Sequence, residues 1–329
     1  KIPRDFCTYL ANGSNKTTMI KLNFEFIQDS KGKVVNILRT RMLVLSGEDS
    51  CHKVTLSTCE PFPELLSNQE EADTKVIAHS FLSHQQAAYN QVVIRSPSGD
   101  TDIVVLAVIL LNQDKEKVFI DNGCGRSRTL QWLGNLEISE RRCRSLIGLH
   151  AFTGNDYVSS FFRKSKDRCW KLLEKYDKFE ECLMTLGNSI PLNDDGLLQL
   201  EEFVCYLYGV KTKSVNDARW NIFNQKYKRE NKVPDLSSLP PCQQALYYHS
   251  KRSNLVAYIW RKSQQPSFDL PDISNMDGLQ MGRFNGLMTR FLKMLSICYL
   301  MTKIMRMRMM NFTAVKLIAT TISISYKEL

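Results

Sequence analysis

Strand-like and helix-like segments alternate between residues 67 and 155, and this alternation restricts the chain to a small set of architectures. Residues 92–96 (VVIRS) and 117–123 (KVFIDNG) are short apolar runs bounded by turn residues, which is typical of buried strands. Between them, residues 102–111 (DIVVLAVILL) suit a buried helix, although their valine and isoleucine content also allows a strand. The pattern predicts an α/β fold with a central, mainly parallel sheet flanked by helices.

Two further helices are predicted from the signals at their ends. Residues 67–70 (SNQE) fit a capping box, in which Glu70 is the third residue of a helix that ends near Gln86. Residues 139–152 begin with a serine suited to cap a helix, and Gly154 is well placed to end it. A mostly helical C-terminal region is predicted to follow the α/β unit.

The last part of the chain has a different composition. Residues 281–329 hold eight Lys and Arg against one Glu, which is +7 of the chain's net charge of +10. Phe284, Leu287 and Phe291 fall on one helical stripe with basic residues opposite, and a basic amphipathic helix can bind a membrane surface, a partner groove or nucleic acid. The abrupt change equally fits a tail that is unrelated to the domain or disordered.

Several classes of protein are excluded or disfavoured by the sequence. Ten cysteines are scattered without CxxC or zinc-ligand spacing, which indicates reduced thiols and a nuclear or cytoplasmic location. No apolar run reaches the length of a transmembrane segment. A GxSxG elbow, a Walker loop and a dinucleotide-binding loop are all missing from the sequence. The positive net charge permits a polyanionic partner, and the oligomeric state stays open.

Acidic residues follow the ends of the predicted strands. Asp100 and Asp102 come directly after residues 92–96, and Asp121 ends the next strand. Asp156 follows a predicted helix end, and we expect it at the same edge. Ligands of open α/β sheets bind beyond the carboxyl ends of the strands, so this edge is the predicted site.

A further acidic group, Glu70, Glu71 and Asp73, opens the helix that precedes the first of these strands. Asp73 shares a helical stripe with Ile77 and therefore faces the core. Glu70 is on that side too, but it has a competing role in the capping box. On an ideal helix Glu71 lies about 160° from Asp73, which directs it to solvent unless the first turn is distorted.

Carboxylates that converge on one edge repel each other unless a divalent cation neutralises them. Mg²⁺ and Mn²⁺ prefer carboxylate and water oxygens as ligands. Two such ions about 3.5–4 Å apart could activate a water and stabilise the leaving oxygen in phosphodiester cleavage. Capping and the helix dipole also favour acids at helix N-termini, so both interpretations stay open.

Three blocks of sequence carry a family resemblance: NQEEADTKVIAHS, VVIRSPSGDTDIVVLAV and LIGLHAFTGNDYVSSFF. In this order they resemble a group of uncharacterised animal proteins, over roughly residues 1–275, whose members look associated with mobile elements. More remotely, over about residues 70–160, they resemble the flap-endonuclease-like nucleases of the PIN-like superfamily. In those nucleases a Glu-Ala-Glu opens a helix, an Asp-x-Asp follows a strand, and a Gly-x-Asp-Tyr comes later.

The resemblance assigns roles residue by residue. Glu71 and Asp73 match the first motif, Asp100 and Asp102 the second, and Asp156 the third. It implies that these five residues hold Mg²⁺ or Mn²⁺ and catalyse cleavage of DNA or RNA. Helix geometry keeps Glu70 as an alternate, and the position at a strand end keeps Asp121 as another. The nucleases take further aspartates from an N-terminal strand, which residues 1–60 do not convincingly supply. Either that part is cut off or the site is degenerate, which would leave an inactive nucleic-acid-binding or scaffold protein.

The resemblance and the composition together divide the chain into four parts. Residues 1–60 would be the N-terminal segment of a truncated PIN-like domain, 61–160 the PIN-like core with the acidic site, 161–275 a helical region, and 276–329 the basic Met-rich tail. Four arginines near the acidic edge are candidate phosphate ligands, with solvated surface charge as the alternative. They are Arg126 and Arg128 in a glycine-containing loop, and Arg141 and Arg142 at a helix start.

Overall fold

The computed structural model describes residues 42–47, 50–55, 57–69, 71–85, 91–97, 99–269 and 271, scattered residues between 9 and 27, and the backbone of 322–325. These residues belong to two compact units. The first contains the described residues up to Leu136, together with Ser263–Asp269 and the strand at 322–325. The second contains Glu137–Lys262 and residue 271. The boundary at Glu137 lies inside the predicted 61–160 segment, so the helix that follows it belongs to the second unit.

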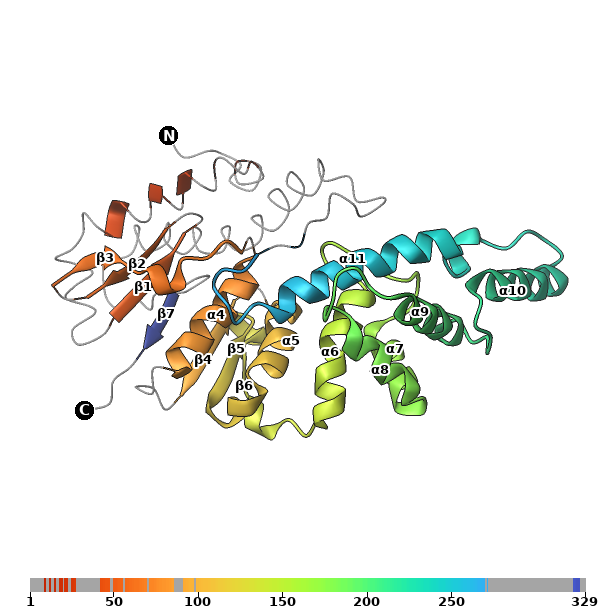
Figure 1. Ribbon diagram of the computed structural model, residues 1–329, viewed down its shortest axis with the longest axis horizontal. Coiled ribbons are helices and arrows are strands. Elements are labelled where there is room, and N and C mark those ends of the chain that lie inside the picture. The colour runs from red at the N-terminus through yellow and green to blue at the C-terminus, as the bar shows by residue number, and fades with distance from the viewer. Residues whose placement is uncertain are drawn as a thin grey trace. The chain divides into compact units, whose positions relative to one another are not determined.

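The first unit has an antiparallel sheet in the order β3-β2-β1-β7 (Figure 1). Its strands are β1 (Met42–Ser46), β2 (Cys51–Val54), β3 (Cys59–Pro61) and β7 (Ile322–Ser325). Strand β1 is buried on both faces, because Leu43 and Leu45 cluster with Val54 while Val44 packs with Ala78 of the helix α4 (Ala72–Gln85). This two-sided burial explains the continuous apolar run MLVL in β1.

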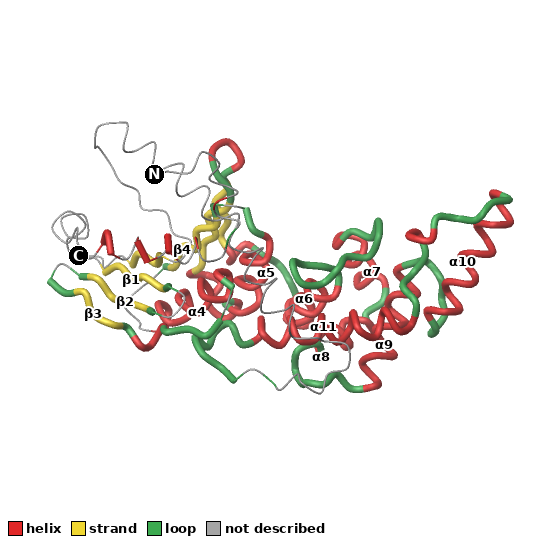
Figure 2. The backbone as a smooth tube through the Cα atoms, turned by 90° about the horizontal axis from the view of Figure 1, so that it is seen from above, coloured by secondary structure: helices red, strands yellow, loops and turns green. Residues whose placement is uncertain are grey.

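A second sheet in the same unit has the order β4-β5-β6. The strands are β4 (Val92–Ser96), β5 (Val118–Asn122) and β6 (Thr129–Trp132), and α5 (Thr101–Leu110) connects the first two. Strands β4 and β5 are parallel, with Ile94 opposite Ile120 and both side chains buried. The β4-α5-β5 segment is therefore a βαβ unit, as the alternating pattern predicts. Figure 2 shows α4 and α5 beside β4.

The predicted α/β class is confirmed, but a large parallel sheet is not seen among the described residues. Parallel pairing there is limited to β4 with β5, since β6 pairs antiparallel with β5. Strand β6 was not predicted, because all four of its residues are exposed and lack the apolar signal of a buried strand. Trp132 stabilises this edge by stacking on Phe119, with ring centroids 6.3 Å apart.

The second unit is helical over its described residues, as the sequence predicts for most of it. Its helices are α6 (Glu140–Phe152), α7 (Lys166–Lys175), α8 (Lys178–Thr185), α9 (Asp194–Leu207), α10 (Val215–Glu230) and α11 (Gln243–Arg261). Ser139 caps α6 as predicted, with its side chain accepting from the Arg142 N–H. Phe152, Phe203 and Trp260 are fully buried and form part of the core of this unit.

The described residues also form short 3₁₀ helices. They are η1 (Pro63–Leu65), η2 (Asn112–Lys117), η3 (Gly125–Ser127), η4 (Leu133–Asn135) and η5 (Leu236–Ser238). In the part of the chain that the structure describes, no helix has the length and apolar character needed to span a membrane. The predicted amphipathic helix of the tail lies outside the described residues.

Candidate metal centre

The helix α4 begins later than the predicted capping box requires. Its first residue is Ala72, and the carbonyl of Glu71 accepts the first helical hydrogen bond, from the Lys75 N–H at 3.3 Å. The Ser67 hydroxyl accepts instead from the Gln69 N–H at 3.1 Å, so it caps a local turn and not a helix. The capping-box prediction is therefore wrong, and Glu70 lies outside the described residues.

The late start of α4 changes the expected direction of Glu71. Because Glu71 precedes the helix, the ideal-helix angle to Asp73 does not apply to it. Its side chain is buried, with 8% exposure, where that angle predicts a solvent-facing one. Asp73 lies in the first turn of α4 and is half-buried, in agreement with its predicted orientation toward the protein interior.

A segment almost 200 residues away in sequence fixes the approach to α4. Within the first unit, the Asn68 side-chain amide donates to the Phe268 carbonyl at 2.8 Å, and the Ser267 hydroxyl donates to the Leu66 carbonyl at 3.0 Å. The Gln69 amide also donates to the carbonyl of Gln265. These bonds hold residues 66–69, and therefore the N-terminus of α4, in place. No local pattern in the sequence signals this support.

The turn between β4 and α5 places the second pair of acids. The Gly99 N–H donates to the Ser96 carbonyl at 3.3 Å, and Gly99 has a φ of +78°, which favours glycine. Asp100 then acts as the N-cap of α5, because its Oδ1 accepts from the Asp102 N–H at 3.0 Å. Asp102 follows in the first turn of the helix.

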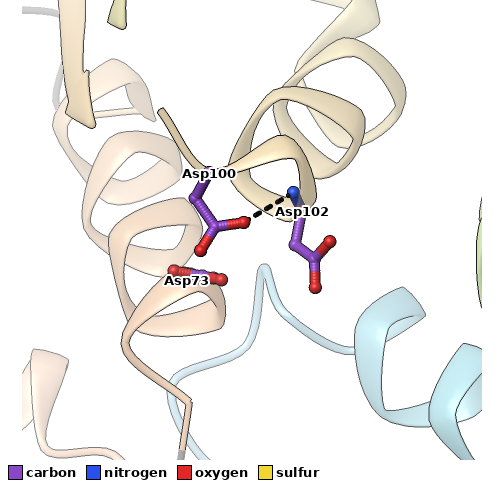
Figure 3. A group of neighbouring side chains, drawn as sticks. All are labelled: Asp73, Asp100 and Asp102. Atoms are coloured by element: carbon purple, nitrogen blue, oxygen red, sulfur yellow. Dashed lines mark hydrogen bonds between the residues drawn. The ribbon is translucent and has the colours of Figure 1, made fainter. Parts of the chain in front are cut away.

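Asp73, Asp100 and Asp102 form one acidic cluster at the N-termini of α4 and α5 (Figure 3). One oxygen from each of the three half-buried side chains lies within 4.8 Å of the other two. Figure 3 shows the second oxygen of Asp100 turned toward Asp73. Two full negative charges at such a separation repel by roughly 3 kcal/mol at an effective dielectric constant of about 20.

This acidic cluster could hold a metal ion. Its ligands would be three hard carboxylate oxygens, which match Mg²⁺, Mn²⁺ or Ca²⁺ better than ions that prefer thiolates or imidazoles. The positive ends of two helix dipoles offset part of the repulsion, so capping contributes to the arrangement as well. The sequence predicted all three members, and the tertiary structure brings them together.

Asp156 lies in the second unit, and it is not a member of the acidic cluster. It is exposed in the loop after α6, where the Asn155 side chain accepts from the Tyr157 and Val158 N–H groups at 2.9 and 3.2 Å. Gly154 has a φ of +113°, and an added Cβ would lie 2.8 Å from the Ser160 Cα. The loop therefore has a defined local conformation, while a role of Asp156 at the metal centre stays a prediction.

Asp121, the predicted alternate ligand, is buried and bound by two arginines. Arg128 makes a bidentate pair with it, with both N···O distances 2.7 Å, and the Arg95 Nη1 lies 3.2 Å from its Oδ1. The hydrogen bond with Asp121 raises the pKa of the Arg128 guanidinium. Asp121 therefore ties β5 to β4 and to the loop after β5, and Arg128 has a carboxylate partner instead of a free phosphate-binding role. Arg126 is exposed in the same loop.

Arg141 and Arg142 also have carboxylate partners. Both bind the buried Glu180 of α8, with Nε–Oε distances of 3.0 and 2.7 Å. Arg142 further lies over the ring of Trp170, 5.3 Å from its centroid. The pair therefore compensates a buried charge between α6 and α8, which explains why two arginines tolerate an unfavourable position in the helix dipole. Only the tertiary fold shows Glu180 as their partner.

Asp102→Asn is expected to stabilise the metal-free protein by about 1 kcal/mol, because relief of repulsion exceeds the loss of a first-turn charge. A divalent ion at about 100 times its Kd should stabilise the wild type by about 2.7 kcal/mol and the variant much less. Thermal unfolding with EDTA, Mg²⁺ or Mn²⁺ measures both effects.

Asp195→Asn is the matched control for this measurement, because Asp195 is an exposed aspartate in the first turn of α9. This variant should be less stable than the wild type by a few tenths of a kcal/mol, because the interaction of the carboxylate with the helix dipole is lost. Mg²⁺ or Mn²⁺ should stabilise it as much as the wild type. If Asp102→Asn behaves like Asp195→Asn and neither metal shifts the wild type, the acids only cap their helices.

Comparisons of the chain with family models, with curated proteins and with solved structures gave no match. The predicted family resemblance is therefore neither supported nor contradicted by them. The interpretation of the acidic cluster depends on its residues and their geometry.

Proposed function

We propose that this chain is a divalent-metal-dependent nuclease that hydrolyses phosphodiester bonds of DNA or RNA, with a PIN-like, flap-endonuclease-like domain. The observation that carries the proposal is the cluster of Asp73, Asp100 and Asp102. Its members come from two separate segments that resemble successive motifs of those nucleases. Mg²⁺ or Mn²⁺ is the proposed ion, because the donor set is made of carboxylates.

The residues of the chain have distinct proposed tasks. Asp73 and Asp102 offer oxygens from the first turns of two helices, while Asp100 also holds the Asp102 backbone through its cap. A bound ion supplies activation of water and stabilisation of the leaving oxygen. Glu71 and Asp156 are proposed as further acidic residues for metal binding, as the resemblance implies. Arg126 is the proposed phosphate contact, since Arg128, Arg141 and Arg142 have carboxylate partners.

The test is cleavage of labelled flap, hairpin and single-stranded oligonucleotides of DNA and RNA with Mg²⁺, Mn²⁺ or EDTA. We expect the wild type to cleave at least one substrate with metal and none with EDTA. Asp102→Ala should lower the rate by about 100-fold or more, as expected when a group that stabilises the transition state is removed.

Asp195→Ala controls for loss of a first-turn aspartate, because Asp195 occupies in α9 the position that Asp102 occupies in α5. This variant should cleave at the wild-type rate. Equal cleavage by Asp102→Ala and Asp195→Ala would exclude the acidic cluster as the active site.

The second candidate function is nucleic-acid binding without cleavage. Two observations favour it. The acidic cluster within the described residues has three members, fewer than the five acids that the resemblance assigns to the site. The further acid Asp121 is neutralised by Arg95 and Arg128. Binding of labelled oligonucleotides without cleavage in either metal, with normal folding by circular dichroism, would select this candidate over the nuclease.

A further inference from the structure

The helix α10 carries a ladder of three aromatic rings on its outer face. Trp220 stacks on Phe223 with ring centroids 6.5 Å apart and planes 9° apart, and Phe223 stacks on Tyr227 at 6.2 Å and 6°. The side chains of Trp220 and Tyr227 are 65% and 44% exposed. Three nearly parallel rings therefore form a continuous platform, which we call the aromatic ladder.

The two end rings of the aromatic ladder, Trp220 and Tyr227, are exposed, and Phe223 between them is half-buried. The buried residues of this helix are Val215, Ala218 and Ile222, which lie on the opposite side of an ideal helix from Trp220 and Tyr227. Aromatic residues at helical spacing usually enter a core, but here the core face is formed by other residues. The exposed rings therefore form a surface, which suits contact with a ligand.

Cations gather beside the ladder within the same unit. Lys164, on the loop before α7, has its pKa lowered by burial first and then by the charges of Arg168 and Lys226. Lys226 belongs to α10 and follows Phe223 by three residues, so these two side chains are neighbours on the helix surface. Its Nζ also donates to the Ser238 hydroxyl at 2.6 Å. Grouped positive charges of this kind are stabilised by a polyanion.

The acids of this region have local partners. Glu230 pairs with Arg229 at 2.6 Å, and Asp235 accepts hydrogen bonds from the Ser237 N–H and hydroxyl. Asp217 lies in the first turn of α10, where the helix dipole favours it. Helix α10 carries four Lys and Arg and two acids, a net charge of +2.

We propose that the aromatic ladder and the adjacent cations, Lys164, Arg168 and Lys226, bind single-stranded nucleic acid, with bases stacked on the rings and phosphates beside the cations. Every base has a π-face, so such a surface is tolerant of sequence. The ring spacing of 6.2–6.5 Å is about twice the ~3.4 Å rise per base of a duplex strand, so it matches a strand extended from its stacked form. This inference needs no cleavage and goes beyond the proposed function.

The test is binding of fluorescein-labelled oligo(dT) and oligo(U) of about 20 nucleotides by fluorescence anisotropy in EDTA, so that no cleavage interferes. We expect Trp220→Ala to weaken binding about tenfold or more, and Trp220→Phe to stay within about threefold of the wild type. Oligonucleotides should also quench the tryptophan fluorescence of the wild type more than that of Trp220→Phe.

Two matched controls test whether the loss of oligonucleotide affinity is specific to the aromatic ladder and its cations. Trp132→Ala removes a partly exposed tryptophan from β6 of the other unit, and it should bind like the wild type. Lys226→Gln should weaken binding and flatten its dependence on salt, whereas Lys117→Gln, at an exposed lysine of η2, should do neither.

Three results would overturn the inference. The first is an equal affinity of Trp220→Ala and Trp132→Ala for the single strand, and the second is no binding at all. The third is a wild-type dimer in sedimentation velocity that Trp220→Ala dissociates, because the ladder would then be an interface between copies. Loss of cleavage in Asp102→Ala with unchanged oligonucleotide affinity would leave the inference intact, so the two proposals fail separately.

Discussion

Lowering the pH from 7 to 5 is expected to destabilise each of the two units by about 2 kcal/mol, because each one buries a neutral histidine. In the first unit, the Nε2 of His79 lies 2.6 Å from the Ser46 hydroxyl, and burial followed by the charge of Lys75 lowers its pKa to about 4. In the second unit, the Nε2 of His249 donates to the Phe152 carbonyl at 2.8 Å, and burial lowers its pKa to about 4.

The direction of this effect follows from proton binding in the folded and unfolded states. Below the unfolded pKa of 6.5, the unfolded chain binds protons that both folded histidines still exclude. The contribution of each neutral histidine to the free energy of unfolding is therefore complete above pH 6.5. It falls as the pH drops and is almost entirely lost near the folded pKa of about 4. The complete loss is about 3 kcal/mol per histidine, at roughly 1.36 kcal/mol for each unit of pKa.

Urea unfolding of the wild type, His79→Gln and His249→Gln at several pH values measures this effect. Each variant should be less stable than the wild type at neutral pH, because a packed ring is lost. On acidification, the free energy of unfolding of each variant should also fall by about 2 kcal/mol less than that of the wild type, since one titrating group is gone. An unchanged pH dependence in both variants would show that other groups dominate the acid response.

Gly148→Ala is expected to destabilise the second unit by about 3 kcal/mol, because α6 and α8 approach each other too closely for a side chain. A Cβ on Gly148 would lie 2.9 Å from the carbonyl carbon of Leu183 and closer still to its oxygen. The clash is with backbone, so no rotamer change can relieve it, and the two helices must move apart. Movement would also strain the pairs of Arg141 and Arg142 with Glu180.

Gly209→Ala is the matched control for this prediction. Gly209 has a φ of +88°, but an added Cβ meets nothing within 4 Å. Its substitution should therefore cost about 1–2 kcal/mol, from the left-handed backbone conformation alone. Thermal unfolding of both variants, followed by circular dichroism, compares steric clash with backbone strain. Equal destabilisation by the two substitutions would contradict the close approach of α6 to α8.

Local patterns predicted several of the helices and strands correctly in both units. The strand at 92–96, the helix after Asp100 and the serine cap at Ser139 agree with the structure, because each depends on neighbours within a few residues. The capping box at residues 67–70 failed although its residue types are suitable. Hydrogen bonds with Gln265, Ser267 and Phe268 hold that stretch outside the helix, and a local pattern contains no information about them.

The arginines predicted to bind phosphate show that local patterns do not reveal distant partners. Their residue types and positions suit phosphate binding, but Arg128 pairs with Asp121, and Arg141 and Arg142 pair with Glu180. A buried carboxylate needs a cation, and whether a cation meets it is decided by packing between distant segments. The aromatic ladder shows the converse: its i, i+3 and i+7 spacing is visible in the sequence, but only the fold shows that Trp220 and Tyr227 are exposed.

Local sequence patterns were enough to predict the alternation of strands and helices, the acids at two helix N-termini, and the helical character of the second unit, because hydrophobic periodicity and end signals are local. Which acids lie together depends on the packing of distant segments: Asp73 lies beside Asp100 and Asp102, while Asp121 is paired with Arg95 and Arg128. The tertiary structure also decided the start of α4 and the burial of Glu71. Contacts between distant segments set these features, since the free energy of burying a charge depends on what the fold places beside it.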